Sequence, residues 1–168
     1  FLLRNSDARS TDYDSLKEVY RPGHADRTWE AKYGLRDHRG GGRSSARETA
    51  ARVVGGAIAR QLLALAGIRV AAYVDQVGAE RSVVPYNELD LTSVWNNDVR
   101  TADPEAATRM AALIEQVRAD GDSIGGQIRC IAHGVPAGLG EPVFDKLHAD
   151  LGKAMLSINA VKGFAIGN

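Results

Sequence analysis

The sequence predicts a domain in which helices pack on a β-sheet. The chain has 168 residues, 44% of them apolar, which suffices for one domain with a hydrophobic core. Stretches with helical spacing of apolar residues alternate with stretches in which every second residue is apolar. No internal repeat or low-complexity segment interrupts them. We therefore treat residues 1–168 as a single domain.

The first predicted helix follows three consecutive glycines and ends at Gly67. Ser45 and Glu48 have the spacing of a capping box, in which each side chain bonds a free backbone N–H at the helix start. The apolar face then repeats at helical spacing. It comprises Val53, Val54, Ala57, Ile58, Leu62 and Leu65.

A strand and a second helix come next. In IRVAAYV, residues 68–74, every second residue from Ile68 is apolar, which predicts a half-buried strand with Ile68, Val70, Ala72 and Val74 on its buried face. Residues 89–101 show no regular period. Asp103 and Pro104 then form a helix cap and a first-turn proline. The apolar stripe of this helix, which ends at Gly121, comprises Ala107, Met110, Leu113, Ile114 and Val117.

The remaining sequence predicts one more strand and one more helix. The strand covers residues 124–132, and the turn-rich loop GVPAGLGEP follows it. The buried face of the helix is expected to contain Phe144, Leu147, Leu151, Ala154, Met155 and Ile158.

Charge is balanced over the chain but not along it. There are 21 basic and 21 acidic residues, so the whole-protein cationic field typical of nucleic-acid-binding proteins is absent, and we predict no nucleic-acid partner. Residues 21–60 hold nine Lys or Arg against four Asp or Glu, a local charge of +5. Such a cluster suits a small polyanion, and a solvated helix face is the alternative.

Composition also bears on compartment and metal binding. No apolar run is long enough to cross a bilayer and no signal peptide is recognisable, so we predict a cytoplasmic protein with no membrane partner. Cys130 is the only cysteine, so neither an intramolecular disulfide nor a cysteine-based metal cage can form, and no metal site is predicted. We expect Cys130 to be a small buried apolar residue.

The segment HRGGGRSSARET, residues 38–49, has the composition of an anion-binding loop. Glycines let backbone N–H groups approach a ligand, Ser44 and Ser45 add hydroxyl donors, and the following helix presents the positive end of its dipole. Arg43 and Arg47 flank these groups. The alternative is a tight turn before a capped helix, with its arginines in water. An arginine-glycine RNA-binding tail is disfavoured because the unit occurs once and precedes an apolar helix.

Five motifs extend the argument beyond composition. They are RPGHAD at 21–26, RGGGRSSARETAARV at 39–53, GDSIGG at 121–126, GVPAGLGEPVFDKL at 134–147 and AMLSINAVKGF at 154–164. In this order and at this spacing they resemble chorismate synthase, and the resemblance covers nearly the whole chain. Compared with that family, we expect the chain to be an internal portion that lacks an amino-terminal segment and a long carboxy-terminal segment.

The resemblance implies an enzyme of the shikimate pathway. Such an enzyme makes chorismate from 5-enolpyruvylshikimate 3-phosphate by a 1,4-anti elimination of phosphate. The family requires reduced FMN although the reaction has no net redox change, and NADPH is needed only if the whole protein reduces its own flavin. The resemblance also implies an α+β fold, a β-α-β sandwich with helices packed between antiparallel sheets, and a homotetramer. Without it, the alternative is a non-catalytic phosphate- or nucleotide-binding module.

The matched motifs carry the site residues of the family. His24 resembles one of two family histidines that act as acids. Flavin-contacting positions are matched by Arg43, Ser44, Ser45, Asn159 and Ala160. Substrate-contacting positions are matched by Arg21, Ser45 and Arg47. The second histidine and further flavin contacts are expected outside this chain, so we expect the chain alone to be inactive.

Overall fold

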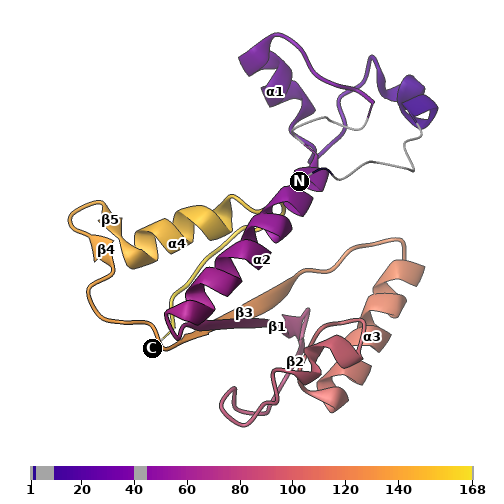
Figure 1. The fold of residues 1–168 in the computed structure, drawn as a ribbon. Coiled ribbons are helices and arrows are strands. Elements are labelled where there is room, and N and C mark those ends of the chain that lie inside the picture. Colours follow the sequence, from indigo (N-terminus) through magenta and orange to yellow (C-terminus); the bar gives the residue numbers. More distant parts are fainter. Residues whose placement is uncertain (1, 3–9, 40–44, 168) are drawn as a thin grey trace. The chain divides into compact units, whose positions relative to one another are not determined.

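Helices and short antiparallel sheets alternate along the chain (Figure 1). The computed structural model describes residues 2, 10–39 and 45–167. The helices are η1 (Ser10–Leu16), α1 (Asp26–Tyr33), η3 (Ala46–Glu48), α2 (Thr49–Leu65), η4 (Ser93–Asn96), α3 (Pro104–Ala119) and α4 (Leu147–Leu156), where η marks a 3₁₀ helix. The strands are β1 (Arg69–Val77), β2 (Glu80–Arg81), β3 (Gly126–His133), β4 (Gly140–Glu141) and β5 (Asp145–Lys146). No helix in these described ranges is long and apolar enough to cross a membrane.

The chain forms two compact units, and the boundary between them falls within α2. Unit 1 comprises Phe1–Ile58 and Gly138–Asn168, and unit 2 comprises Ala59–Ala137. The single domain predicted for residues 1–168 stays a prediction.

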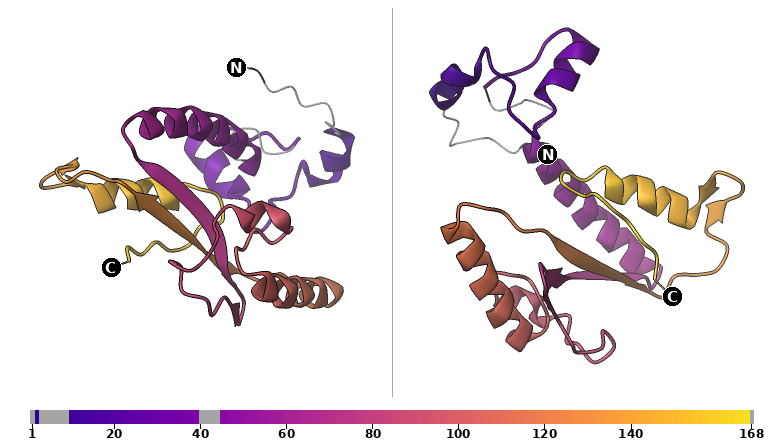
Figure 2. Two further views of the ribbon diagram at one scale, coloured as in Figure 1. Left: turned by 60° about the horizontal axis from the view of Figure 1, so that its bottom comes forward. Right: turned by 180° about the vertical axis from the view of Figure 1, so that it is seen from behind.

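Unit 2 is built on a three-stranded antiparallel sheet with the order β2-β1-β3. β1 and β3 form the long pair, which ends with Val77 opposite Gly126 and has a register shift between Val74 and Gln76. Gly126 is needed there because a Cβ at this position would collide with the Gln76 carbonyl oxygen. Figures 1 and 2 show this pair as the long ribbon of the unit, with α3 beside the end that carries β2.

The core of unit 2 lies on one face of β1. Tyr73 is 2% exposed and packs with Val94 of η4 and with Ala102. Further along the strand, Val77 packs with Met110 of α3. Burial of these apolar side chains supplies the main favourable term for folding of this unit. Residues 89–101, which show no period in the sequence, therefore contribute to the core.

The strand predicted over residues 68–74 is confirmed as β1, but its buried face is the opposite one. Ala72 is exposed and Val74 is half-buried at the edge of the Val77–Met110 cluster, whereas Tyr73 is buried under η4. Cys130 of β3 pairs with Ala72 and is exposed as well. The expectation of a buried thiol is therefore wrong for the same reason.

The helix predicted after Asp103 is confirmed as α3. The Asp103 carboxylate accepts hydrogen bonds from the backbone N–H groups of Glu105 and Ala106, both at 3.0 Å, and from the Ser82 hydroxyl at 2.9 Å. Burial favours the neutral acid, but these bonds outweigh burial and lower the pKa of Asp103. In the predicted apolar stripe, Met110 is fully buried.

Unit 1 contains the β4–β5 hairpin followed directly by α4, the third predicted helix. Phe144 lies in the turn between β4 and β5 and is 87% exposed, so its placement on the buried helix face is wrong. The helix begins only at Leu147. Its buried residue is Gly152, where a Cβ would lie 3.3 Å from the ring of Phe164.

Candidate functional site

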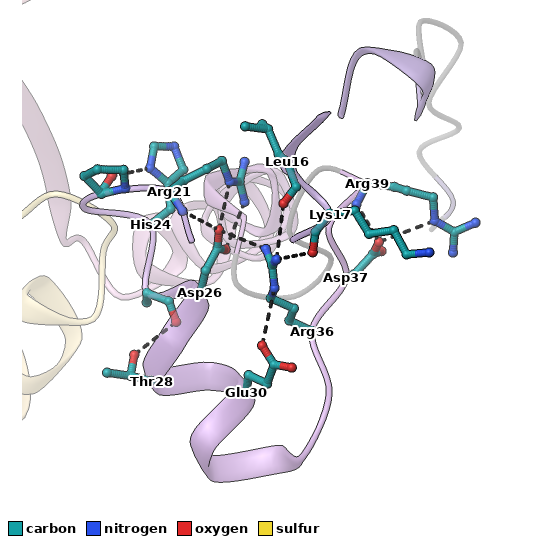
Figure 3. Close-up of polar contacts among 12 residues, drawn as sticks. Leu16, Lys17, Arg21, His24, Asp26, Thr28, Glu30, Arg36, Asp37 and Arg39 are labelled. Atoms are coloured by element: carbon teal, nitrogen blue, oxygen red, sulfur yellow. Dashed lines mark hydrogen bonds and ion pairs between the residues drawn. The ribbon is translucent and has the colours of Figure 1, made fainter. Parts of the chain in front are cut away.

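The RPGHAD segment folds into a turn closed by its own two end residues (Figure 3). Asp26 begins α1 and is 3% exposed. Its carboxylate accepts hydrogen bonds from the backbone N–H of Arg21 at 3.1 Å and from the side-chain Nε and Nη2 of Arg21 at 3.0 and 3.1 Å. One carboxylate thus holds both the backbone and the guanidinium of the same arginine, in a charge-assisted bidentate geometry.

Arg36 completes this cluster from the segment after α1. Its Nη1 lies 3.4 Å from Asp26 Oδ2, and its Nε lies 3.4 Å from Glu30 Oε2. Its Nη2 donates to the backbone carbonyl oxygens of Leu16, at 3.2 Å, and of Lys17. The Arg36 side chain is 9% exposed. All three guanidinium nitrogens of this nearly buried cation therefore have an acceptor, as Figure 3 shows.

Asp26 is held in its ionised form by these contacts. Hydrogen bonds from the Arg21 side chain lower its pKa more than burial raises it, and the Arg21 backbone N–H and the charges of Arg21 and Arg36 lower it further. The bond to Asp26 raises the pKa of Arg21 in turn. The opposite directions of the two shifts are those of an ion pair that stabilises both charged forms.

His24 lies on the exposed outer side of the same turn. Its Nδ1 is 2.8 Å from the carbonyl oxygen of Pro22. A carbonyl oxygen can only accept, so this contact requires Nδ1 to carry the proton of the neutral ring, and Nε2 is the other ring nitrogen. The next residue, Ala25, has a left-handed backbone with φ of 57°, which costs a non-glycine residue about 1–2 kcal/mol. The position of His24 is therefore defined by the hydrogen bond to Pro22 and by the left-handed backbone of Ala25.

Ser45 caps the helical segment that leads into α2. Its hydroxyl oxygen accepts a hydrogen bond from the Arg47 backbone N–H at 3.3 Å, and its carbonyl oxygen accepts one from Glu48 at 3.2 Å. The Ser45 half of the predicted capping box is confirmed, although through the Arg47 N–H, and a short 3₁₀ turn, η3, precedes α2. The Glu48 carboxylate pairs with Arg52 at 2.9 Å. Arg47 is exposed.

Two side-chain contacts join the start of α2 to the segment after α4, and we call this the α2–α4 junction. Thr49 Oγ1 donates to Asn159 Oδ1 at 3.3 Å, and Arg52 Nη1 donates to Ser157 Oγ at 2.7 Å. The partners are 110 and 105 positions apart in the sequence. The residue after Asn159, Ala160, has a left-handed backbone with φ of 67°. Residues 49–52 and 157–159, which lie in or next to the two motifs predicted to contact flavin, therefore meet at this junction.

The predicted site residues lie in two places on unit 1. Arg21 and His24 lie in the RPGHAD turn. Those at or beside the α2–α4 junction are Ser45, Arg47, Asn159 and Ala160. Arg43 and Ser44 lie outside the described residues.

Comparison with known proteins identifies the family. The chorismate synthase family matches the chain over residues 1–168. The chain belongs to the chorismate synthase family. It is 55% identical over 168 residues to the chorismate synthase of Christiangramia forsetii and 56% identical over 167 residues to that of Bacteroides thetaiotaomicron. The chorismate synthase of Methanosarcina mazei is 56% identical over 166 residues.

The chain spans about half the length of the chorismate synthases that it matches. The first two alignments include 100% and 99% of this chain but 47% of each relative. A solved crystal structure of a chorismate synthase has a similar fold, with a TM-score of 0.72 at 30% identity over 83% of this chain and 45% of that one. These matches confirm the resemblance drawn from the five motifs. They also confirm a mixed α+β class with antiparallel sheets.

Sequence reasoning missed Asp26 and Arg36. RPGHAD contains Asp26, but the contact between its carboxylate and the arginine five positions earlier was not predicted. Arg36 entered only as one of the nine basic residues between positions 21 and 60. The one available signal was the Pro-Gly pair between Arg21 and Asp26, because such a pair favours a turn that brings the flanking residues together.

Proposed function

We propose that this chain supplies part of the active site of a chorismate synthase, a cytoplasmic lyase of the shikimate pathway. The reaction is the 1,4-anti elimination of phosphate from 5-enolpyruvylshikimate 3-phosphate to give chorismate, with reduced FMN as the cofactor. Family membership over residues 1–168 at 55% identity to a chorismate synthase supports this proposal. The β-α-β sandwich, with helices between antiparallel sheets, and the homotetramer belong to the same proposal for the whole protein.

The structural observation that carries the proposal is the placement of two arginines, Arg21 in the RPGHAD turn and the exposed Arg47 beside the Ser45 cap. The substrate has two carboxylates and a phosphate, and guanidinium groups bind such anions through paired, charge-assisted hydrogen bonds. Arg21 turns its Nε and Nη2 edge toward Asp26, so the opposite edge, with Nη1, is the one that can receive an anion. Arg47 is exposed beside the Ser45 cap at the helix start. In this proposal Arg21, Ser45 and Arg47 bind the substrate.

The α2–α4 junction has donors that fit the cofactor. Thr49 donates to Asn159 Oδ1, which leaves the two amide hydrogens of the exposed Asn159 carboxamide for a flavin acceptor. The left-handed backbone of Ala160 turns the chain at this point. We propose that these two residues hold FMN together with Arg43, Ser44 and Ser45. When bound, reduced FMN supplies the electron density that helps phosphate leave and takes up the hydrogen.

His24 presents Nε2 for proton transfer in this proposal. The bond between Nδ1 and the Pro22 carbonyl oxygen fixes the tautomer and the ring orientation. The exposed position on the outer side of the turn leaves Nε2 accessible. A histidine oriented in this way can protonate or electrostatically support the reduced cofactor.

The test uses a chimera of full family length, in which residues 1–168 replace the matching region of the Christiangramia forsetii protein. With pre-reduced FMN and the substrate under anaerobic conditions, we expect chorismate to form within about tenfold of the rate of the parent relative, since most matched positions are identical. A chimera that folds but shows neither turnover nor a substrate-enhanced difference spectrum of reduced FMN would contradict the proposal. Binding of FMN or phosphate without turnover would favour the non-catalytic binding module.

A further inference from the structure

One carboxylate in unit 1 is buried between two arginines. Asp26 is 3% exposed, and the side chains of Arg21 and Arg36 are 16% and 9% exposed. Burying charged groups is unfavourable unless they are paired and hydrogen-bonded, and replacing a buried ion pair by apolar residues is often neutral or stabilising. A contribution to folding stability therefore does not by itself explain why these three charged residues are buried together. The contacts within the cluster indicate a further role.

The contacts with Asp26 fix the conformation of Arg21. The carboxylate binds the Arg21 backbone N–H, Nε and Nη2 together. It therefore fixes the position of both the backbone and the guanidinium of Arg21. A free arginine side chain samples many rotamers and loses that freedom when it binds a ligand. An arginine already held in one conformation loses less, and this preorganisation increases affinity.

Arg36 fixes the carboxylate in its turn. Its Nη1 approaches Asp26 Oδ2, the same oxygen that accepts from the Arg21 N–H and Nε. Its other nitrogens bind Glu30 of α1 and the carbonyl oxygens of Leu16 and Lys17. Arg36 therefore joins Asp26, at the start of α1, to Glu30 in the same helix and to the end of η1. A lysine has one nitrogen and lacks the fork needed for all these contacts.

We propose that Asp26 and Arg36 are positioning residues that hold Arg21 ready to bind an anionic group of the substrate. This inference rests on the proposed function, which assigns Arg21 to substrate binding. Arg21 meets the substrate, Asp26 acts only through Arg21, and Arg36 acts only through Asp26. The chain of contacts predicts that substrate affinity depends on Asp26 only while Arg21 is present.

A double-mutant cycle in the chimera tests this dependence. The variants are D26N, R21A and the pair together, and the measurement is the dissociation constant of the substrate from the difference spectrum of bound reduced FMN. We expect D26N alone to weaken substrate binding about ten- to hundredfold, the loss of one charge-assisted contact. In the R21A background, D26N should change substrate affinity less than about twofold. The FMN dissociation constant and the rate at saturating substrate should change little with D26N.

Asp37 supplies a matched control. It lies in the same segment and pairs with Arg39 at 3.6 Å, but the side chains are 43% and 64% exposed. An exposed pair of this kind contributes little, so D37N should leave substrate affinity unchanged. R36K, which keeps the charge and loses the fork, should weaken substrate binding in the presence of Arg21 and not in the R21A background. If D26N does not fold, the same cycle with D26E or R36K decides the question.

The outcomes separate this inference from the function on which it rests. If R21A does not weaken substrate binding, the assignment of Arg21 in the proposed function is wrong. If R21A weakens binding but D26N has the same effect with and without Arg21, the cluster is a structural anchor and the positioning role is refuted. If D26N lowers substrate and FMN affinity equally, the carboxylate supports the local fold and the inference is again refuted.

Discussion

Replacing His24 with alanine should slow the chemical step of the chimera and leave folding nearly unchanged. The side chain is exposed, and its hydrogen bond goes from Nδ1 to the Pro22 carbonyl oxygen, which also lies at the surface and can be hydrated when the ring is removed. An exposed hydrogen bond contributes about 0.5–1.5 kcal/mol, and no core cavity opens. The free energy of unfolding should therefore fall by about 1 kcal/mol or less.

The kinetic effect should be much larger than the effect on stability. A positioned general acid typically contributes about 10²–10⁴-fold to the rate. With pre-reduced FMN and excess enzyme, the single-turnover rate of substrate decay should fall within that range in H24A. Substrate and FMN should still bind, because the contacts assigned to them lie on Arg21 and at the α2–α4 junction. His24→Gln is the companion variant, since its amide can donate a hydrogen bond but cannot transfer a proton.

The two variants together distinguish proton transfer from positioning. If H24Q restores most of the rate lost in H24A, a hydrogen bond rather than a proton is what the site requires from this residue. If H24A turns over substrate at the parental rate, His24 is a turn residue and has no role in the chemistry. An unfolding free energy that falls by several kcal/mol would instead mean that the turn depends on the ring, and the kinetic comparison would rest on H24Q.

Three further predictions concern the isolated chain, the residues before α2 and the cap of α3. The 168-residue chain by itself should form no measurable chorismate with reduced FMN, because groups that act as a unit fail together; near-parental turnover would refute this. In the chimera, R47A should weaken substrate binding by about ten- to hundredfold and FMN binding less, whereas Ser44→Ala should weaken FMN binding more than substrate binding. If titrations show that both variants weaken the binding of both ligands equally, the loop has only a structural role. Asp103→Asn should reduce the free energy of unfolding by about 1–2 kcal/mol at pH 7, because neutral acceptors bind less strongly than charged ones. The pKa of Asp103 is lower in the native state, so the ionised carboxylate stabilises the fold above its unfolded pKa of about 3.9, and this contribution is lost as the pH falls through the native pKa. In urea denaturation at a series of pH values, the free energy of unfolding should therefore decrease less below about pH 4 in D103N than in the unsubstituted chimera.

Regular periodicity made the longer elements predictable. α3 is the clearest case, since Asp103 caps it, Pro104 opens it and Met110 is buried in its stripe. α1 was not predictable in this way. Its sequence, DRTWEAKY, has no apolar stripe, and its buried residue is Asp26. A helix that is stabilised at its start by two arginines from outside the helix leaves no periodic signal.

The face of β1 could not be predicted from its own residues. IRVAAYVDQV offers an apolar set on each side, and pattern alone favours the side with Val70 and Val74. The structure buries Tyr73 and Val77, because η4 and α3 supply their partners. Which face of a strand is buried depends on what packs against it, and Val94 comes from a segment with no period.

The candidate site was also only partly predictable, because motifs identify residues but not the residues that contact them. Motifs located Arg21, His24 and Ser45 in the sequence, since a family resemblance transfers residue types position by position. The Asp26–Arg36 contact and the bond between Thr49 and Asn159 join residues 10 and 110 positions apart, and only a three-dimensional structure reveals such pairs.

Two of the three non-glycine residues with a positive φ in the described part of the chain lie in segments that the motifs single out. Ala25 and Ala160 have left-handed backbones, and Asp26 is a buried carboxylate next to the first of them. Arg100 also has a positive φ, of 64°, but its carbonyl oxygen accepts from Val74 N–H within the core of unit 2, which accounts for its conformation locally. Local rules are broken most often where function requires it. The two alanines and the aspartate lie where ligands are proposed to bind, so the unfavourable conformations and the buried charge are consistent with a site held rigid before its ligands arrive.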